Sequence, residues 1–272
     1  MRLSTKVALI AATGIAALAA ASPAMAWAPA GTAAIHPGVQ TVTDGSGQCT
    51  ANFIFQDGSN TYIGQAAHCS STGAATETDG CSSQSLPLGT SVEIEGATKP
   101  GVMVYNSWLA MQQVGETDPD TCAYNDLALV RIDPADVASV NPSIPNFGGP
   151  VGLNTSGTAP GDKVYSYGNS SLRQGITLLS PKEGFSLGDD ANGWTHTVYT
   201  LTPGIPGDSG SAFLDANGNA LGVLSTVAIA PLPASNGVGD VAKEIAWANS
   251  TGGQSISLVK GTEPFKGGLL PI

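Results

Sequence analysis

Residues 202–214 read TPGIPGDSGSAFL and place one serine, Ser209, between two glycines and directly after an aspartate. Gly, Asp and Ser are common turn formers, so this stretch alone describes either a tight surface turn or a loop that holds a nucleophile. A serine hydroxyl is a weak nucleophile and needs a general base within hydrogen-bond reach. The rest of the chain therefore has to supply a base and a fold that brings this base to Ser209.

The composition predicts a fold of short β-strands. The chain has 272 residues, including 35 glycines and 18 prolines, and only 11% of its residues are charged. Short apolar runs alternate with clusters of turn-forming residues, a pattern typical of all-β proteins. The predicted strands are residues 50–55, 61–67, 91–95, 102–111, 127–132, 163–167, 175–179, 195–202, 211–214 and 221–227. Asp57-Gly and Asn217-Gly predict hairpin turns, and residues 239–249, with Asp240 suited to cap the first turn, predict one C-terminal helix.

The first residues have the layout of a secretory signal peptide. Arg2 and Lys6 make a basic start, an apolar run of small residues follows, and residues 24–26 read AMA, an A-x-A cleavage signal. The apolar run is shorter than the roughly 20 residues that a membrane span requires. We therefore expect residues 1–26 to direct secretion and to be removed.

Charge and cysteine usage narrow the classes of partner and compartment. The net charge of −11 argues against nucleic acid or an anionic membrane as a partner. No Cys/His spacing typical of a metal site is present, and we expect neither a metal nor another cofactor. The four cysteines fit an oxidising compartment and allow three disulfide pairings. They are Cys49, Cys69, Cys81 and Cys122.

The chain supplies a candidate base and a candidate orienting acid. His68 ends an apolar run, and a bridge between Cys49 and Cys69 would hold it there, leaving Cys81 and Cys122 for a second bridge. Asp126 opens another apolar run, and a buried aspartate needs a partner such as a histidine N–H. His68 can take the proton of Ser209, and Asp126 can fix the imidazole tautomer. The alternative for His68 is a structural histidine. For Asp126 it is an aspartate at a strand end, and for Ser209 it is a tight turn without a catalytic role.

The order His68, Asp126, Ser209 is the order of the double-β-barrel enzymes and not of the subtilisin or α/β-hydrolase types. The blocks AAHC (66–69), NDLALV (125–130) and GDSGS (207–211) resemble the three signature blocks of chymotrypsin-like secreted bacterial serine proteases, in particular actinobacterial ones. This resemblance spans roughly residues 47–227. It implies an all-β fold of two six-stranded antiparallel β-barrels with a short C-terminal helix and the triad in the cleft between the barrels.

The resemblance also implies roles around the nucleophile. The N–H groups of Gly207 and Ser209 would form the oxyanion hole, and Asp208 would hold the loop through an ion pair. The usual Ile-Val-Gly-Gly start is missing, so the partner of Asp208 is not evident. The residues expected to bind substrate or support the pocket are Pro203, Gly204, Pro206, Ser225, Thr226 and Val227. Pro203 replaces the acid that would select Arg or Lys, which favours an apolar side chain before the cleaved bond.

The expected domain organisation follows from these signals. It comprises a signal peptide (1–26), an N-terminal extension or short pro-segment (27–40), an N-terminal barrel (41–145), a C-terminal barrel with the helix (146–250) and a Gly-rich tail (251–272). The expected function is a secreted, monomeric serine endopeptidase that cleaves a protein or peptide substrate through an acyl-enzyme. The alternatives are an exported binding protein with little turnover on the same fold, and an esterase-like hydrolase. His196 is expected to be a structural histidine.

Overall fold

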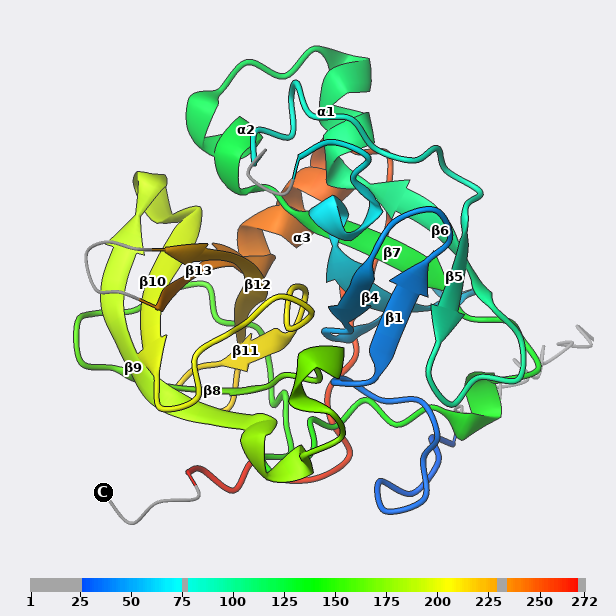
Figure 1. The fold of residues 1–272 in the computed structure, drawn as a ribbon, viewed down its shortest axis with the longest axis vertical. Helices are drawn as coiled ribbons and strands as arrows, with labels where there is room; N and C mark the ends of the chain where they lie inside the picture. The colour runs from blue at the N-terminus through cyan, green and yellow to red at the C-terminus, as the bar shows by residue number, and fades with distance from the viewer. Residues whose placement is uncertain (1–25, 75–77, 229–233, 269–272) are drawn as a thin grey trace, which may run out of the picture.

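The computed structural model describes residues 26–74, 78–228 and 234–268, which fold into two β-structures lying side by side (Figure 1). The predicted signal peptide lies outside the described residues apart from Ala26. Within the described ranges, no helix is both long enough and apolar enough to span a bilayer.

The N-terminal half, joined by β14 from the C-terminal tail, forms one curled antiparallel sheet in the order β14-β3-β4-β7-β6-β5-β1-β2. Its strands are β1 (Gln40–Thr43), β2 (Gln48–Thr50), β3 (Ile54–Gln56), β4 (Thr61–Ala66), β5 (Ser91–Ile94), β6 (Gly101–Asn106), β7 (Leu127–Arg131) and β14 (Ser257–Leu258). This sheet has eight strands where six were predicted, because the short strands β2 and β14 extend its two edges.

The C-terminal half is a closed antiparallel barrel in the order β10-β13-β12-β11-β8-β9. Its strands are β8 (Lys163–Tyr167), β9 (Pro181–Asp190), β10 (Thr195–Thr200), β11 (Ala212–Leu214), β12 (Ala220–Ala228) and β13 (Ser235–Asp240). The predicted all-β class and the six-stranded C-terminal barrel are therefore confirmed.

Strand β7 is buried on both faces. Leu127 and Leu129 pack in the apolar cluster that joins the two halves, and Ala128 and Val130 pack inside the first sheet. Successive side chains of a strand point to opposite faces, so one apolar run serves both cores. Because Asp126 directly precedes this strand, it enters the interior between the two halves.

Both predicted hairpin turns are confirmed. Strands β3 and β4 pair around the turn at Asp57, whose Oδ1 accepts hydrogen bonds from Ser59 N (2.8 Å) and Asn60 N (2.7 Å). Strands β11 and β12 pair around the turn at Asn217. These turns are stabilised by local side-chain to backbone hydrogen bonds, which is why the sequence predicted them.

The helices are only partly as predicted. Helix α3 (Val241–Ser250) is confirmed, and the Asp240 side chain caps it by accepting from Lys243 N at 2.7 Å. The predicted strand 102–111 is wrong in its second half, since α1 (Ser107–Val114) starts after Asn106, whose side chain caps it. Helix α2 (Pro119–Tyr124) was not predicted, although an aspartate cap followed by proline is a helix-start signal.

Two strands of the C-terminal barrel were missed, and one prediction there is wrong. Residues 175–179 do not form a strand; a 3₁₀ turn, η4 (Thr177–Leu179), lies there, and the strand begins at Pro181. Strand β13 contains Asn236-Gly237 and Gly239-Asp240, pairs that predict turns by themselves. Pairing with β10 and β12 overrides these local preferences.

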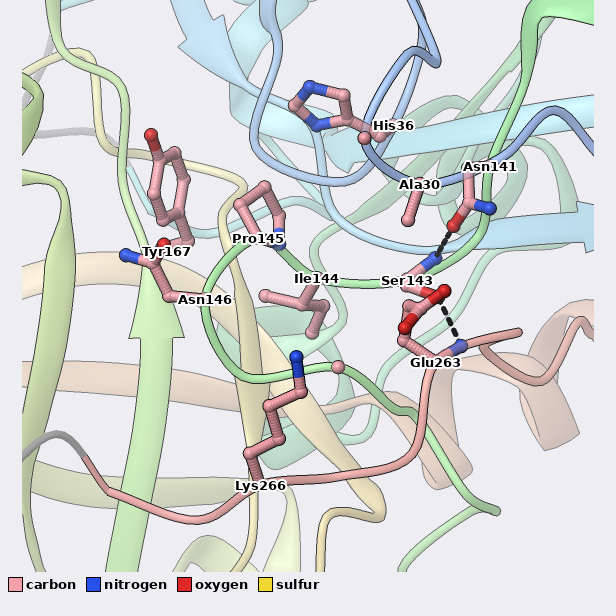
Figure 2. Close-up of a pocket in the computed structure, with 12 residues that line it drawn as sticks. Ala30, His36, Asn141, Ser143, Ile144, Pro145, Asn146, Tyr167, Glu263 and Lys266 are labelled. Atoms are coloured by element: carbon pink, nitrogen blue, oxygen red, sulfur yellow. Dashed lines mark hydrogen bonds between the residues drawn. The ribbon is translucent and has the colours of Figure 1, made fainter.

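The segments before β1 and after α3 are built into the fold. Ile35 is completely buried, and Ala28 N donates to Val140 O at 2.9 Å. The chain after α3 returns to the first sheet, where β14 pairs with β3. Both segments meet the connector between the two halves at a pocket of about 460 Å³, where Glu263 N donates to Ser143 Oγ (Figure 2). This pocket contains none of the predicted site residues.

Candidate active site

His68 lies in a short 3₁₀ turn, η1 (Ala67–Ser70), at the end of β4. The predicted disulfide between Cys49 and Cys69 is present and ties this turn to β2. The second disulfide joins Cys81 to Cys122 on α2. The strand end and the first disulfide therefore fix the backbone that carries the histidine.

Asp126 meets His68 twice and Ser225 once. The His68 Nδ1 to Asp126 Oδ2 distance is 2.7 Å, and the His68 backbone N donates to Asp126 Oδ1 at 2.9 Å. Ser225 Oγ donates to Oδ2 at 2.5 Å. Asp126 is only 3% exposed, and these bonds compensate the cost of burying its carboxylate.

The surroundings of His68 adjust its basicity. Burial by itself lowers the pKa of the imidazole, but the charge of Asp126 and its hydrogen bond outweigh this effect and raise the pKa above its ordinary value. The side chain is 25% exposed. His68 Nε2, the atom not engaged by Asp126, has no hydrogen-bond partner among the described residues and is free to meet a substrate or a nucleophile.

The Ser209 loop packs against the strands that lead to His68. Thr50 N donates to Ser209 O at 2.8 Å, and a Cβ added to Gly210 would lie 2.9 Å from Ala66 N. Ser209 Oγ also has no hydrogen-bond partner within the described residues. In enzymes without substrate, the bond between nucleophile and base is often long and tightens on binding.

The peptide groups around Ser209 have a defined orientation. Pro206 O accepts from Ser170 Oγ, so the N–H of Gly207, on the other side of this trans peptide, points away from Ser170. The N–H groups of Gly207 and Ser209 donate to no acceptor within the described part of the chain. Gly207 has a φ of +93°, and a Cβ there would lie 2.4 Å from Gln48 Oε1, so only glycine fits.

Asp208 is held by two cations that local sequence signals did not identify. Lys182 Nζ lies 2.9 Å and Arg173 Nη2 2.5 Å from Asp208 Oδ2. The side chains of Asp208 and Lys182 are 0% exposed. Burial raises the pKa of Asp208, but the two cations outweigh burial and hold it below the ordinary value. This cluster fixes the loop without a newly formed N-terminus.

Two of the predicted pocket residues, Gly204 and Thr226, are hydrogen-bonded to a buried asparagine that was not predicted. Asn236 Oδ1 accepts from Gly204 N at 2.8 Å, and its Nδ2 donates to Thr226 O at 3.2 Å. Asn236 therefore connects the 203–206 loop to β12. The backbone carbonyls of Thr202 and Pro203 accept from Lys182 Nζ at 3.1 and 3.3 Å. The side chain of Val227 lies outside the described part of the structure.

His196 is fully buried, and its ring hydrogen-bonds to residues outside this group. Its Nδ1 is 2.6 Å from Asp189 Oδ1 and its Nε2 is 3.0 Å from Asp240 Oδ2. Burial lowers the pKa of this imidazole, but hydrogen bonds and charges from both aspartates outweigh burial and raise it. A histidine held at both nitrogens joins β9, β10 and the start of α3.

Two groups of His, Cys and acidic side chains among the described residues lie close enough together to share a metal ion, and both include disulfide-bonded cysteines. Disulfide sulfurs are not thiolates, which are the form that binds metals.

Comparison with known proteins supports the fold. No protein-family model matches the chain, and no curated protein matches its sequence. Protease A of Thermobifida fusca superposes with a TM-score of 0.53 at 19% identity, over 84% of this chain and 99% of that chain. A glutamic acid-specific serine protease gives 0.52 at 16% identity (83% and 100% covered), and a Glu endopeptidase gives 0.51 at 19% (83% and 93%). The chain therefore has the double-β-barrel fold of these bacterial serine proteases.

Proposed function

We propose that this chain is a secreted serine endopeptidase that cleaves peptide bonds through an acyl-enzyme. The observation that carries this function is the hydrogen-bonded group of His68, Asp126 and Ser225 beside a glycine-rich loop that presents Ser209. The free N–H groups of Gly207 and Ser209 on that loop add a site for negative charge.

In the proposed reaction, Ser209 Oγ attacks the substrate carbonyl while His68 Nε2 takes its proton. Asp126 stabilises the resulting imidazolium, and the Gly207 and Ser209 N–H groups bind the oxyanion. His68 then gives the proton to the leaving amine, which forms the acyl-enzyme. A water molecule attacks this ester by the same steps in reverse. Each oxyanion donor contributes about 10²- to 10³-fold in rate.

The substrate main chain would pair with β12. This strand pairs with β13 as far as Ala228, but its pairing with β11 ends at Val223. Among the described strands, no partner pairs with the other edge of residues 225–227, so a peptide can add there as a strand.

The preferred side chain before the cleaved bond would be small and apolar. Pro203 supplies no charge to select Arg or Lys. The Asn236 bridge ties the 203–206 loop to Thr226 and would limit the space available to a large side chain there. Asn236→Ala removes this bridge and is expected to raise the rate for leucine or phenylalanine relative to alanine at that position. Unchanged relative rates on a set of matched peptides would contradict this role.

One experiment tests the enzyme class. The secreted protein is treated with a fluorophosphonate probe and compared with Ser209→Ala, which should not be labelled. Absence of labelling of the wild type would refute the enzyme proposal and leave a binding protein on a protease fold. Ester turnover without cleavage of a peptide library would instead indicate an esterase-like hydrolase.

The secreted form is proposed to begin at Trp27 and to keep residues 27–39. The buried Ile35 and the bond from Ala28 N to Val140 O support this, because removing the segment would expose the apolar surface that it covers. The mass of the active protein from a culture supernatant tests it. A mature N-terminus near residue 40 would show that the segment is a pro-segment.

A further inference from the structure

Besides Ser225, a second side chain of the C-terminal half, Glu244, contacts Asp126. Glu244, in the first turn of α3, is completely buried, and its Oε1 accepts a hydrogen bond from Asp126 N at 2.9 Å. Ser225, on β12, donates to the Asp126 carboxylate. The C-terminal half thus engages Asp126 at its side chain through Ser225 and at its main chain through Glu244.

The Glu244 carboxyl group sits tightly against backbone. A Cβ added to Gly239 would lie 2.8 Å from Glu244 Oε1 and 3.0 Å from Tyr124 O, so a larger residue there would push against the carboxyl group. No ion pair between described residues gives Glu244 a cationic partner. The ionisable groups that act on it are the carboxyls of Asp126 and Asp240, together with the Tyr105 hydroxyl from β6.

The surroundings of Glu244 favour its uncharged form. Burial, and then the neighbouring negative charges, raise its pKa well above the ordinary value. An uncharged carboxyl group still offers an oxygen that accepts from Asp126 N. It can therefore hold the main chain without adding a second negative charge beside the carboxylate that faces His68.

We propose that Glu244 is a positioning residue for the triad, holding the main chain of Asp126 so that its carboxylate stays aligned with His68. This role rests on the proposed function for its effect on rate. The Asp126 carboxylate contacts His68 at two atoms, so a shift of its backbone would disturb both contacts. A displacement of about 1 Å at a reacting geometry can cost 10²-fold in rate.

Three substitutions of Glu244 distinguish the role of its acceptor oxygen from the role of its carboxylic acid group. Glu244→Leu removes the acceptor at similar volume, and Glu244→Asp withdraws it by one methylene. Both are expected to lower kcat by about 10- to 100-fold with KM little changed, because the buried Asp126 N–H loses its partner. Glu244→Gln keeps an uncharged acceptor and is expected to retain most of the wild-type kcat.

Glu116→Leu is the matched control. Glu116 Oε2 accepts from Trp247 Nε1 at 3.1 Å and also links α3 to the N-terminal half, but it does not touch the triad. It is expected to change stability and leave kcat unchanged. Equal losses of kcat in Glu116→Leu and Glu244→Leu would mean that α3 docking alone matters, which would overturn the proposal.

A second readout does not need turnover. In a Ser209→Ala background, NMR titration follows the His68 imidazole, which is one of only three histidines in the chain. Glu244→Leu and Glu244→Asp should lower the pKa of His68 and speed hydrogen exchange at the Asp126 amide, whereas Glu244→Gln should do neither. Should Glu244→Leu fail to fold, the Asp and Gln variants decide.

Two results would refute the positioning role: an unchanged His68 titration in Glu244→Asp, or a Glu244→Gln variant as impaired as Glu244→Leu. A wild type that the fluorophosphonate does not label would refute the proposed function separately. In that case, the His68 titration and the Asp126 exchange rate would still decide the role of Glu244.

Discussion

Replacing Asp208 by asparagine should test how the loop that carries Ser209 is held. The carboxylate accepts hydrogen bonds from Ser170 N (3.0 Å) and Ile205 N (3.1 Å) and forms ion pairs with Lys182 and Arg173. Asp208→Asn leaves both cations without their anion in a site that is closed to solvent. Removing one partner of a buried pair costs about 3–5 kcal/mol. This is a large fraction of the 5–15 kcal/mol that typically stabilises a folded domain.

The assay is urea unfolding followed by tryptophan fluorescence, with ΔG of unfolding obtained by linear extrapolation. Because the pKa of Asp208 is lowered in the fold, its contribution is fully present above the ordinary carboxyl pKa and disappears only as the pH falls through the lowered value. The variants should therefore be compared near pH 6. Activity should fall about 100-fold or more, since the loop that carries the proposed oxyanion donors loses its anchor.

Two further variants make the Asp208 prediction specific. Asp133→Asn breaks the exposed pair with Lys99, 3.5 Å apart with side chains 28% and 59% exposed, and should cost less than about 1 kcal/mol. Adding Lys182→Met to Asp208→Asn removes one uncompensated buried charge and should recover part of the lost stability. A loss below about 1 kcal/mol in Asp208→Asn, or a double variant no more stable than the single one, would refute the reasoning.

Three other measurements follow from the same contacts. The kcat/KM of the wild type should rise with pH as His68 loses its proton, with a midpoint above the ordinary imidazole pKa of 6.5. A midpoint below 6.5 would contradict the raised pKa. Asp126→Asn should lower kcat by about 10⁴-fold. His196 has a raised pKa in the fold, so its contribution to stability is complete below its ordinary pKa and is lost as the pH rises through the raised value. Urea unfolding should therefore show the free energy of unfolding falling from pH 6 to 9. His196→Asn should make this pH dependence flatter. The double variant Cys81→Ser and Cys122→Ser should lose roughly 3–4 kcal/mol of stability, because the disulfide closes a loop of 41 residues. Its kcat at 25 °C should stay unchanged. A large loss of kcat would instead link this disulfide to the candidate active site.

The features that the sequence predicted correctly depend on short-range chemistry. The hairpin at Asp57 and the cap of α3 at Asp240 form between residues only two to three positions apart, so the letters themselves specify them. The contact between His68 and Asp126 was predicted because each residue sits at the end of an apolar run. Adjacent pairing of β4 and β7 then brings these two strand ends together.

The wrong predictions were made where pairing or packing overrides local preference. Residues 107–111 have an apolar pattern that suits a strand, but the Asn106 cap and burial of Trp108 make them the start of α1. Strand β13 is rich in glycine, yet both its neighbours in the closed barrel supply hydrogen bonds. Strand propensity is weak compared with such long-range pairing.

The sequence by itself determined which reactive side chains the protein has: a serine in a glycine-rich loop, a histidine beside a cystine, and an aspartate at the start of a buried strand. Only the tertiary structure decided which other groups hold these residues in place through ion pairs and hydrogen bonds. Arg173 lies 35 residues from Asp208, and Glu244 lies 118 residues from Asp126. A buried charge or N–H must find a partner, but the partner is whichever group the closed barrel and α3 bring within about 3 Å, and no local spacing specifies that distance.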